Sequence, residues 1–263
     1  MKLTLFQIDA FTSRVFGGNP AAVCPLDAWI DADLMQRISQ ENNLSETAFF
    51  TGRDGAYDLR WFTPTTEVNL CGHATLASAY VLFRELGERS NRIRFESRSG
   101  PLYAEREGEM VALDFPAYEG APVDVVPDDL LLGLGEEPEE VFHTPDAKNI
   151  YAVFASESIV RGLKPRFDVL ARLHPNGIVV TAPGDSADCA SRYFAPSYGI
   201  DEDPVTGSAH CGLAPYWSKR LGRLGIHAHQ VSARGGELFC EVQRDRVRIS
   251  GHAVRYLTGT IEV

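Results

Sequence analysis

The feature of this sequence that most limits its possible folds is an internal repeat. The segment from Phe62 to Gly87 (FTPTTEVNLCGHATLASAYVLFRELG) matches the segment from Phe194 to Gly222 (FAPSYGIDEDPVTGSAHCGLAPYWSKRLG). Each segment begins Phe-x-Pro, passes acidic residues and reaches a glycine that lies fifteen residues before the glycine of a Leu-Gly pair. The match continues downstream, from RSGPLYAE to RGGELFCE, at a constant offset of 135 or 136 residues. A constant offset near half the chain length predicts two similar domains that arose from one duplicated unit.

Local patterns predict the contents of each repeated unit. The segment 74–86 is apolar on nearly every side and is followed by Gly87, which predicts a buried helix. Its counterpart, 208–221, contains Pro215 and therefore needs a kink or an irregular first turn. Short, roughly alternating segments predict strands around these helices: 3–9, 48–51, 57–62, 93–97, 102–107, 110–115, 178–182, 191–194, 229–232, 238–243, 246–250 and 258–263. The fold class is α+β, with a curved sheet wrapped around one central helix, twice.

The same reading sets the domain boundaries. Residues 1–117 form the first predicted domain, possibly with the strand 255–263, and residues 146–254 form the second. Between them, residues 118–145 hold several prolines and a cluster of acidic residues, which predicts a connection with a short acidic helix.

Charge and cysteine content narrow the range of partners. The chain has 25 Lys+Arg against 36 Asp+Glu, a net charge of −11, and no basic run, which argues against nucleic acid and anionic membranes. A small-molecule partner is therefore expected. The longest apolar stretch, 75–83, is about half of a membrane span, and no targeting segment is visible. Five widely spaced cysteines without a CxxC motif predict free thiols and a reducing cytoplasm.

The starts of the two central helices predict an anion site. The sequences are CGHA at 71–74 and TGSA at 206–209, each directly after an acid-bearing loop. The first N–H groups of a helix lack partners within it and carry the positive end of its dipole, so each start can hold a carboxylate. Facing one another at the domain boundary, they would make one substrate-binding site. The alternative is that Gly72 and Gly207 are only turn residues.

Four ordered blocks of sequence carry a family resemblance. They are GNPAAVCPL at 18–26, NLSETAFF at 43–50, RWFTPTTEVNLCGHATL at 60–76 and RYFAPSYGIDEDPVTGSAHCGL at 192–213. Together they resemble the signature blocks of the PhzF family, the phenazine-biosynthesis isomerase-like proteins, over nearly the whole chain. The resemblance implies a diaminopimelate-epimerase-like fold of two half-barrels, an active site in the cleft between them, and a homodimer.

The resemblance also implies site residues. Glu46, in the NLSETAFF block, matches the family's catalytic acid/base, and His73, Asp203 and Ser208 match the polar residues that accompany it. Partial burial at the edge of the core would suit Glu46 for taking and returning a proton. His73 near a helix start is expected to be neutral, Asp203 can orient an amine or hydroxyl, and Ser208 can donate to a carboxylate. The alternatives are a surface Glu46 and a structural, buried His73.

The thiols and imidazoles raise separate possibilities. Related two-cysteine racemases and epimerases use a cysteine before each central helix, whereas this chain has Cys71 and Thr206 at the two positions. Threonine is a poor acid, so Cys71 is either a passive variant or an auxiliary acid. The pair His227 and His229 has no third ligand at a helpful spacing, so no metal site is expected. The other cysteines, Cys24, Cys189, Cys211 and Cys240, are expected to be buried.

These observations predict a cofactor-independent isomerase. No P-loop, Rossmann fingerprint or GxSxG motif is present. The enzyme would move a proton within a small carboxylate-bearing metabolite, with Glu46 as general acid/base. One alternative is an amino-acid racemase or epimerase with Cys71 and Glu46 as opposed bases. Another is a non-catalytic, metabolite-binding member of the fold.

Overall fold

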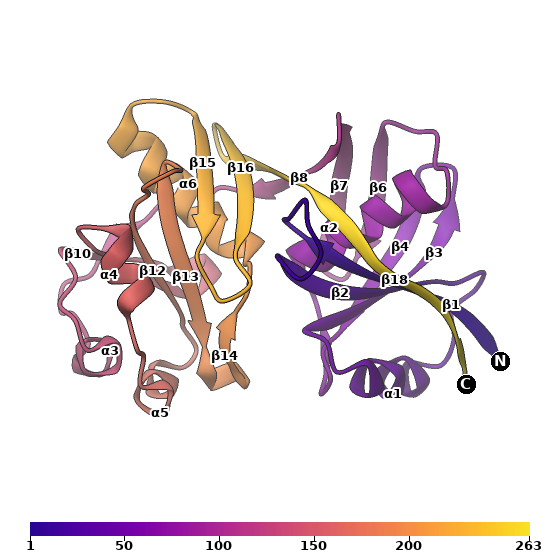
Figure 1. Ribbon diagram of the computed structural model, residues 1–263, viewed down its shortest axis with the longest axis horizontal. Helices are drawn as coiled ribbons and strands as arrows, with labels where there is room; N and C mark the ends of the chain where they lie inside the picture. The colour runs from indigo at the N-terminus through magenta and orange to yellow at the C-terminus, as the bar shows by residue number, and fades with distance from the viewer. The chain divides into compact units, whose positions relative to one another are not determined.

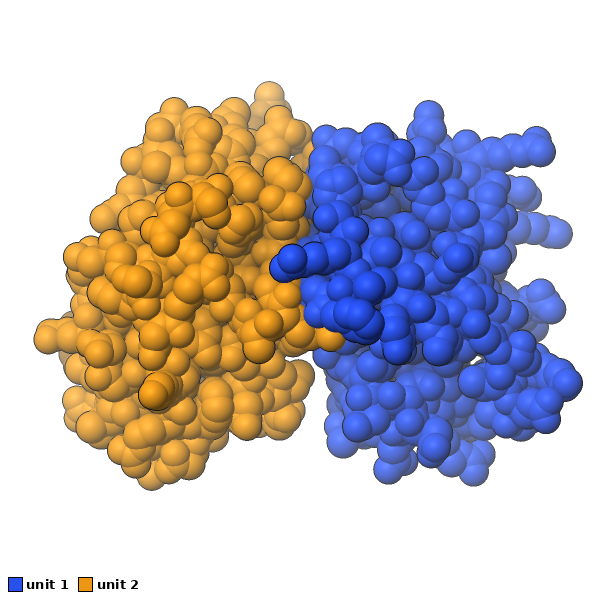
Figure 2. Space-filling model, viewed as in Figure 1, with its two compact units in different colours: residues 1–114, 250–263 blue, residues 115–249 orange.

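The computed structural model of the protein describes residues 1–263 and divides into two compact units (Figure 1). Unit 1 consists of residues 1–114 and 250–263, and unit 2 consists of residues 115–249 (Figure 2). The C-terminal strand thus returns to the first unit, as the sequence allowed.

The strands of unit 1 form a curved sheet. Along the sheet the order is β18 (Ala253–Glu262), β1 (Lys2–Ala10), β2 (Asn19–Pro25), β3 (Glu46–Arg53), β4 (Ala56–Phe62), β6 (Arg92–Ser97), β7 (Gly100–Glu107) and β8 (Met110–Pro116). The short strand β5 (Glu67–Val68) also pairs with β4. The pairs β2–β3 and β4–β6 are parallel, and the other pairs are antiparallel.

The strands of unit 2 follow the same plan. Along the sheet the order is β9 (Ala121–Pro122), β10 (Glu140–Thr144), β11 (Asn149–Val153), β12 (Gly177–Pro183), β13 (Cys189–Ala195), β15 (Gly225–Gln230) and β16 (Gly236–Gln243). The short strand β14 (Ile200–Asp203) also pairs with β13, and β17 (Arg246–Gly251) follows β16 in the chain. From β10 to β16 the pairs run antiparallel, parallel, antiparallel, parallel, antiparallel, as they do from β1 to β7. The α+β fold and the repeated unit are confirmed.

The central helix of unit 1 is buried along its length. Helix α2 (Gly72–Tyr80) contacts β1, β2, β3, β7 and β18, and its residues 73–79 are all buried. The small side chains of its alanines and of Ser78 let the strands approach the helix closely. The buried hydroxyls of Thr75 and Ser78 donate to the carbonyls of Cys71 and Ala74, at 2.6 and 2.7 Å. The helix continues as a π-helical turn, η1 (Val81–Glu85), and Gly87 stops it with a φ of 72°.

The central helix of unit 2 runs unbroken through a proline. Helix α6 (Gly207–Leu221) contains Pro215, which cannot donate to the carbonyl of Cys211. The N–H of Tyr118 donates to that carbonyl instead, at 2.9 Å, so the orphaned acceptor is satisfied from outside the helix. Gly222 ends the helix in the left-handed region, with a φ of 67°.

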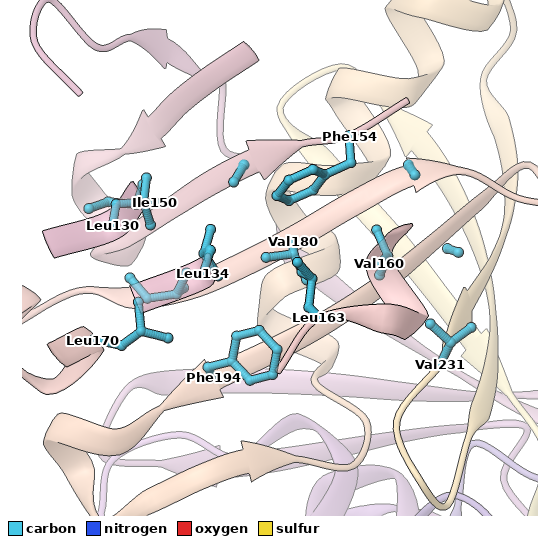
Figure 3. Packing of buried hydrophobic residues seen from close by; sticks show 14 residues of the cluster. Leu130, Leu134, Ile150, Phe154, Val160, Leu163, Leu170, Val180, Phe194 and Val231 are labelled. Atoms are coloured by element: carbon cyan, nitrogen blue, oxygen red, sulfur yellow. The ribbon is translucent and has the colours of Figure 1, made fainter. Parts of the chain in front are cut away.

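The other face of each sheet is also covered. In unit 2, the helices α3 (Asp128–Leu134), α4 (Glu157–Gly162) and α5 (Phe167–Leu170) pack on β11, β12 and β13 (Figure 3). The cluster includes Leu130, Leu134, Ile150, Phe154, Val160, Leu163, Leu170, Val180 and Phe194. In unit 1, helix α1 (Ala32–Asn42) covers Leu5, Ala22, Cys24, Phe49 and Phe62 with Met35 and Ile38. Strand β11 is therefore buried at every residue and does not alternate.

Two expectations need correction. Residues 118–145 belong to unit 2, where they supply β9, β10 and α3. Two prolines of this segment lie at the boundaries of these elements: Pro127 precedes α3, and Pro145 is the first residue of the 3₁₀ turn η2 (Pro145–Ala147). The strand expected at 229–232 is β15, which spans Gly225–Gln230 and pairs with β16 at every residue. Two further 3₁₀ turns lie in unit 2: η3 (Ala171–Leu173), which follows α5, and η4 (Pro196–Tyr198), which follows β13.

The five cysteines are all buried. Burial raises the pKa of the Cys24 and Cys211 thiols to about 12, so neither is a nucleophile near neutral pH. None of the helices combines the length and the apolar character that crossing a membrane would require.

Candidate active site

In unit 1, two elements bring a carboxylate and an imidazole together. Glu46 is the first residue of β3, which runs parallel to β2, and His73 is the second residue of α2, which packs on both strands. Nε2 of His73 lies 3.2 Å from Oε2 of Glu46. The two side chains are only 7 % and 13 % exposed, so this contact is largely withdrawn from water. Glu46 thus lies at the edge of the core, where the sequence predicted it.

His73 is neutral in the folded protein. Burial lowers the pKa of its imidazole to about 3, because the charged form would lose its hydration. The helix position was expected to keep this ring neutral, and in the structure its burial has that effect. A neutral imidazole carries one proton and one lone pair, so the identity of the protonated nitrogen decides what it can offer Glu46.

The side chain of Asn19 sets that tautomer. Its Nδ2, which can only donate, lies 3.2 Å from Nδ1 of His73, so Nδ1 accepts and the ring proton sits on Nε2, the nitrogen nearer to Glu46. Ser45 Oγ donates to Oδ1 of Asn19 at 3.3 Å, which fixes the orientation of the amide. Asn19 is fully buried at the start of β2. Sequence reasoning missed it, although a buried amide opening the run NPAAVC was a usable signal.

Cys71 lies on the Nδ1 side of the His73 ring, as Asn19 does, and away from the Nε2 that is close to Glu46. Its Sγ is 3.5 Å from Nδ1 of His73, and its side chain makes no cap to the helix. The N–H groups of the first turn of α2, which include that of Gly72, therefore donate no hydrogen bond to the side chain of the residue that precedes the helix. Glu46, Cys71 and His73 place their ligand-type atoms within 4.8 Å of one another, a set that could also hold a soft metal ion.

In unit 2, the residues predicted from the sequence gather at the start of α6. The hydroxyl of Thr206 donates to Oδ2 of Asp203 in a short hydrogen bond. The buried Gln230 completes the group, because its Oε1 accepts from the Thr206 N–H and its Nε2 donates to the Asp203 carbonyl, both at 2.8 Å. Gln230 was missed by sequence reasoning, since a lone glutamine at a strand end carries no signal.

The two remaining predicted residues of unit 2 open the same helix. Gly207 is buried, whereas Ser208 is exposed as the second residue of α6. The side chain of Thr206 does not cap the helix, so the first-turn N–H groups lack a side-chain cap, as in unit 1. Each unit therefore has an uncapped helix start beside a carboxylate, Glu46 in unit 1 and Asp203 in unit 2.

A second buried histidine supports the start of α6. Nδ1 of His210 donates to the Thr206 carbonyl at 2.8 Å, and burial lowers the pKa of the ring to about 4. Thr75 makes the equivalent bond in unit 1, where its hydroxyl donates to the Cys71 carbonyl. His210 is a structural residue that the sequence did not single out.

The two buried histidines predict a loss of stability in mild acid. Above pH 6.5 both histidines are neutral in the folded and in the unfolded protein. Below pH 6.5 only the unfolded chain takes up protons on them, until the folded protein also does so at about pH 4 for His210 and about pH 3 for His73. Each should therefore lower the free energy of unfolding by about 1.4 kcal/mol per pH unit in this window. Urea unfolding between pH 6.5 and 5 measures the slope.

The matched variants separate this effect from other acid titrations. His210→Asn keeps a donor toward the Thr206 carbonyl and should remove about half of the histidine-dependent slope. His174→Asn, at an exposed position, should leave the slope unchanged. A slope that His210→Asn does not alter would contradict the assignment.

The structure places one side chain beside His227 and His229 that sequence spacing did not show. The sequence spacing offered no third ligand for His227 and His229, but the hairpin of β15 and β16 places Glu237 opposite His229. Glu237 lies eight residues after His229 in the sequence, so their proximity follows only from the pairing register of β15 and β16.

Comparisons with known proteins agree with this architecture. The family model described as phenazine biosynthesis-like protein matches residues 8–259. An uncharacterized isomerase of Pseudomonas aeruginosa is 51 % identical over 263 residues, covering 100 % of both chains. The crystal structure of a PhzF-family protein from Enterococcus faecalis superposes with a TM-score of 0.96 at 43 % identity and covers 100 % of both chains. A predicted epimerase from Pseudomonas aeruginosa, at 20 % identity, TM-score 0.74 and 99 % coverage of both chains, shares the fold.

The match extends over the whole repeated architecture, including the blocks that hold Glu46, His73 and Asp203. Identity of 51 % over the full length leaves no doubt about common descent. The chain belongs to the phenazine biosynthesis-like (PhzC-PhzF) family and is an isomerase of that family.

Proposed function

We propose that the protein moves a proton within a small carboxylate-bearing metabolite, without a cofactor, and that Glu46 takes and returns that proton. The observation that carries the proposal is the 3.2 Å approach of the Glu46 carboxylate to the neutral imidazole of His73 in a largely buried setting. A carboxylate held this way can accept a proton from carbon and deliver it to a neighbouring atom.

His73 supports this cycle through its Nε2 proton. While Glu46 is ionised, the Nε2 proton 3.2 Å from Oε2 stabilises the negative charge electrostatically. When Glu46 holds the substrate proton, the same N–H is free to turn toward charge that develops on the substrate. Because burial lowers the pKa of the ring to about 3, His73 does not compete with Glu46 for the substrate proton. Asn19 acts as a positioning residue, since it sets the tautomer without reaching the substrate.

The uncapped start of α2 is the proposed anchor for the substrate carboxylate. The N–H groups of Gly72 and its neighbours carry the positive end of the helix dipole, and the side chain of Cys71, the residue before the helix, does not cap them. We also propose that Asp203 and Ser208 contact the substrate, Asp203 through an amine or hydroxyl and Ser208 through an oxygen of an acid group. Gln230 and Thr206 hold Asp203 in place for this role.

The alternative is an amino-acid racemase or epimerase that uses Cys71 and Glu46 as opposed bases. Its supporting observation is that Cys71 and Glu46 contact the same imidazole, at Nδ1 and Nε2. Against it, the second cysteine position of such enzymes is Thr206 here, and its hydroxyl is bound to Asp203 and Gln230. A threonine hydroxyl held in this way cannot serve as a base near neutral pH.

Replacing Cys71 distinguishes the proposed isomerase from the alternative racemase or epimerase. Cys71→Ala should keep kcat/KM within about threefold of the unmodified protein, because the proposed reaction does not pass a proton through sulfur. Iodoacetamide should likewise leave turnover unchanged. A loss of at least about 100-fold in Cys71→Ala, with the fold intact by circular dichroism, would favour the racemase.

We also propose that the chain works as a homodimer in the cytoplasm. Light scattering at micromolar concentration should give twice the 29.0 kDa mass of one chain, and a mass equal to one chain would refute the dimer.

A further inference from the structure

The hairpin of β15 and β16 carries two imidazoles and a carboxylate on one face. His227 and His229 are two residues apart on β15, so their side chains point the same way. In the antiparallel register, His229 pairs with Glu237 and His227 pairs with Phe239. Directly paired residues share a face of the sheet, so Glu237 lies on the face of both histidines. All three residues belong to unit 2 and are separate from the proposed acid/base group.

The polar atoms of the three side chains converge on one point. Nε2 of His227 lies 2.7 Å from Oε1 of Glu237, and Nε2 of His229 lies 3.5 Å from the same oxygen. The three ligand-type atoms all lie within 4.8 Å of one another. The side chains are 26–39 % exposed, so an ion and its water can reach them from solution.

The neighbours of the cluster hold its members in place. The ring of His227 stacks on Phe239, with centroids 4.7 Å apart and planes within 1°, and its edge meets the ring of His229 at 84°. The backbone N–H of His227 donates to Asp188 at 2.8 Å. Ligands that are already oriented lose little freedom when an ion binds.

The charges around the cluster favour a cation. Glu237 brings a carboxylate oxygen against both imidazoles, at 2.7 Å from His227 and 3.5 Å from His229. Two further acids lie near the histidines: Asp188, just before β13, accepts from the backbone N–H of His227, and Glu157 from α4 interacts electrostatically with His229. The basic groups nearby, Arg223 and Arg161, are each paired with one of these two acids.

We propose that His227, His229 and Glu237 bind a divalent transition-metal ion of the Zn²⁺ type. Two imidazole nitrogens and one carboxylate oxygen are a donor set that suits Zn²⁺, Co²⁺ and Ni²⁺ and not Mg²⁺ or Ca²⁺, which take oxygen ligands. The three atoms would close on the ion by small side-chain rotations to bonds of about 2.0–2.2 Å. Water fills the remaining positions. Binding links β15 to β16 just before Gln230, the residue that holds the start of α6.

Titration of the untagged, metal-stripped chain with Co²⁺ tests the site. Calorimetry should show one ion per chain, and the bound ion should give visible d–d absorption without a thiolate charge-transfer band. Zn²⁺ should displace it. His227→Gln, His229→Gln and Glu237→Gln should each weaken binding at least tenfold, while the exposed His174→Gln should bind like the unmodified chain. Zn²⁺ at 100 times its dissociation constant should raise Tm by roughly 5–10 °C.

Three results would overturn the proposal. The first is no binding of Co²⁺ or Zn²⁺ up to millimolar concentration. The second is binding that persists unchanged in the doubly substituted chain with His227→Gln and His229→Gln. The third is a thiolate-to-cobalt band that disappears in Cys71→Ser, which would place the ion at Glu46, Cys71 and His73 instead. None of these results depends on the isomerase activity.

Discussion

Replacing Glu46 by glutamine is expected to lower kcat by about 100-fold to 10,000-fold, the usual contribution of a general acid/base. Glutamine keeps the size of the side chain, and its amide oxygen can take the place of Oε2 beside Nε2 of His73, so the site stays assembled. It cannot take a proton from carbon, so the chemical step is lost while substrate binding is retained. Steady-state kinetics should therefore show the loss in kcat, with KM changed little.

The control is another glutamate that lies outside the site. Glu41→Gln, at an exposed position on α1, should leave kcat and KM within twofold. Melting temperatures of the two variants should match that of the unmodified protein within a few degrees. A Glu46→Gln protein with full turnover would remove the acid/base assignment.

The largest loss of stability is expected from Phe194→Ala in the core of unit 2. The ring of Phe194 is fully buried in the cluster of unit 2 (Figure 3). It meets Phe167 at a centroid distance of 6.0 Å and lies under the guanidinium of Arg192 at 4.9 Å. Truncation removes apolar burial and leaves a cavity among side chains from three helices and the sheet. The free energy of unfolding should fall by about 3–5 kcal/mol, measured by urea denaturation.

Phe16→Ala is the matched control, because the same side chain is 69 % exposed there. It meets only Tyr256 edge-on, so its removal should cost about 1 kcal/mol or less. Equal losses in the two variants would show that this packing does not dominate the stability of unit 2.

The repeat was the strongest guide to the fold. It depends on matched segments rather than on local propensity, so it predicted two similar units and both central helices. The elements that were missed have weak local signals. Strand β2 contains Pro20 and small residues and is buried between neighbours without alternation. Helix α1 ends at Asn43 in the left-handed conformation, so no glycine marked its end.

The candidate site also contains residues that the sequence could predict and residues that it could not. Glu46 and His73 could be predicted because each lies in a block that resembles a known family, and the structure brings their side chains together. Asn19 and Gln230 could not, because their importance comes from contacts with residues 54 and 24 positions away. The direction of a side chain across such a separation is fixed by packing, which one sequence does not display.

The central claim is that Glu46 moves a substrate proton, and isotope labelling in heavy water tests it most directly. The unmodified protein, Glu46→Gln and Cys71→Ala are each incubated with a mixture of small carboxylic-acid metabolites, and mass spectrometry follows isomers and deuterium content. The account predicts that at least one carboxylate is isomerised or gains one deuterium with the unmodified protein and with Cys71→Ala, and stays at background with Glu46→Gln. Isomer formation or labelling by Glu46→Gln at the unmodified rate would contradict it.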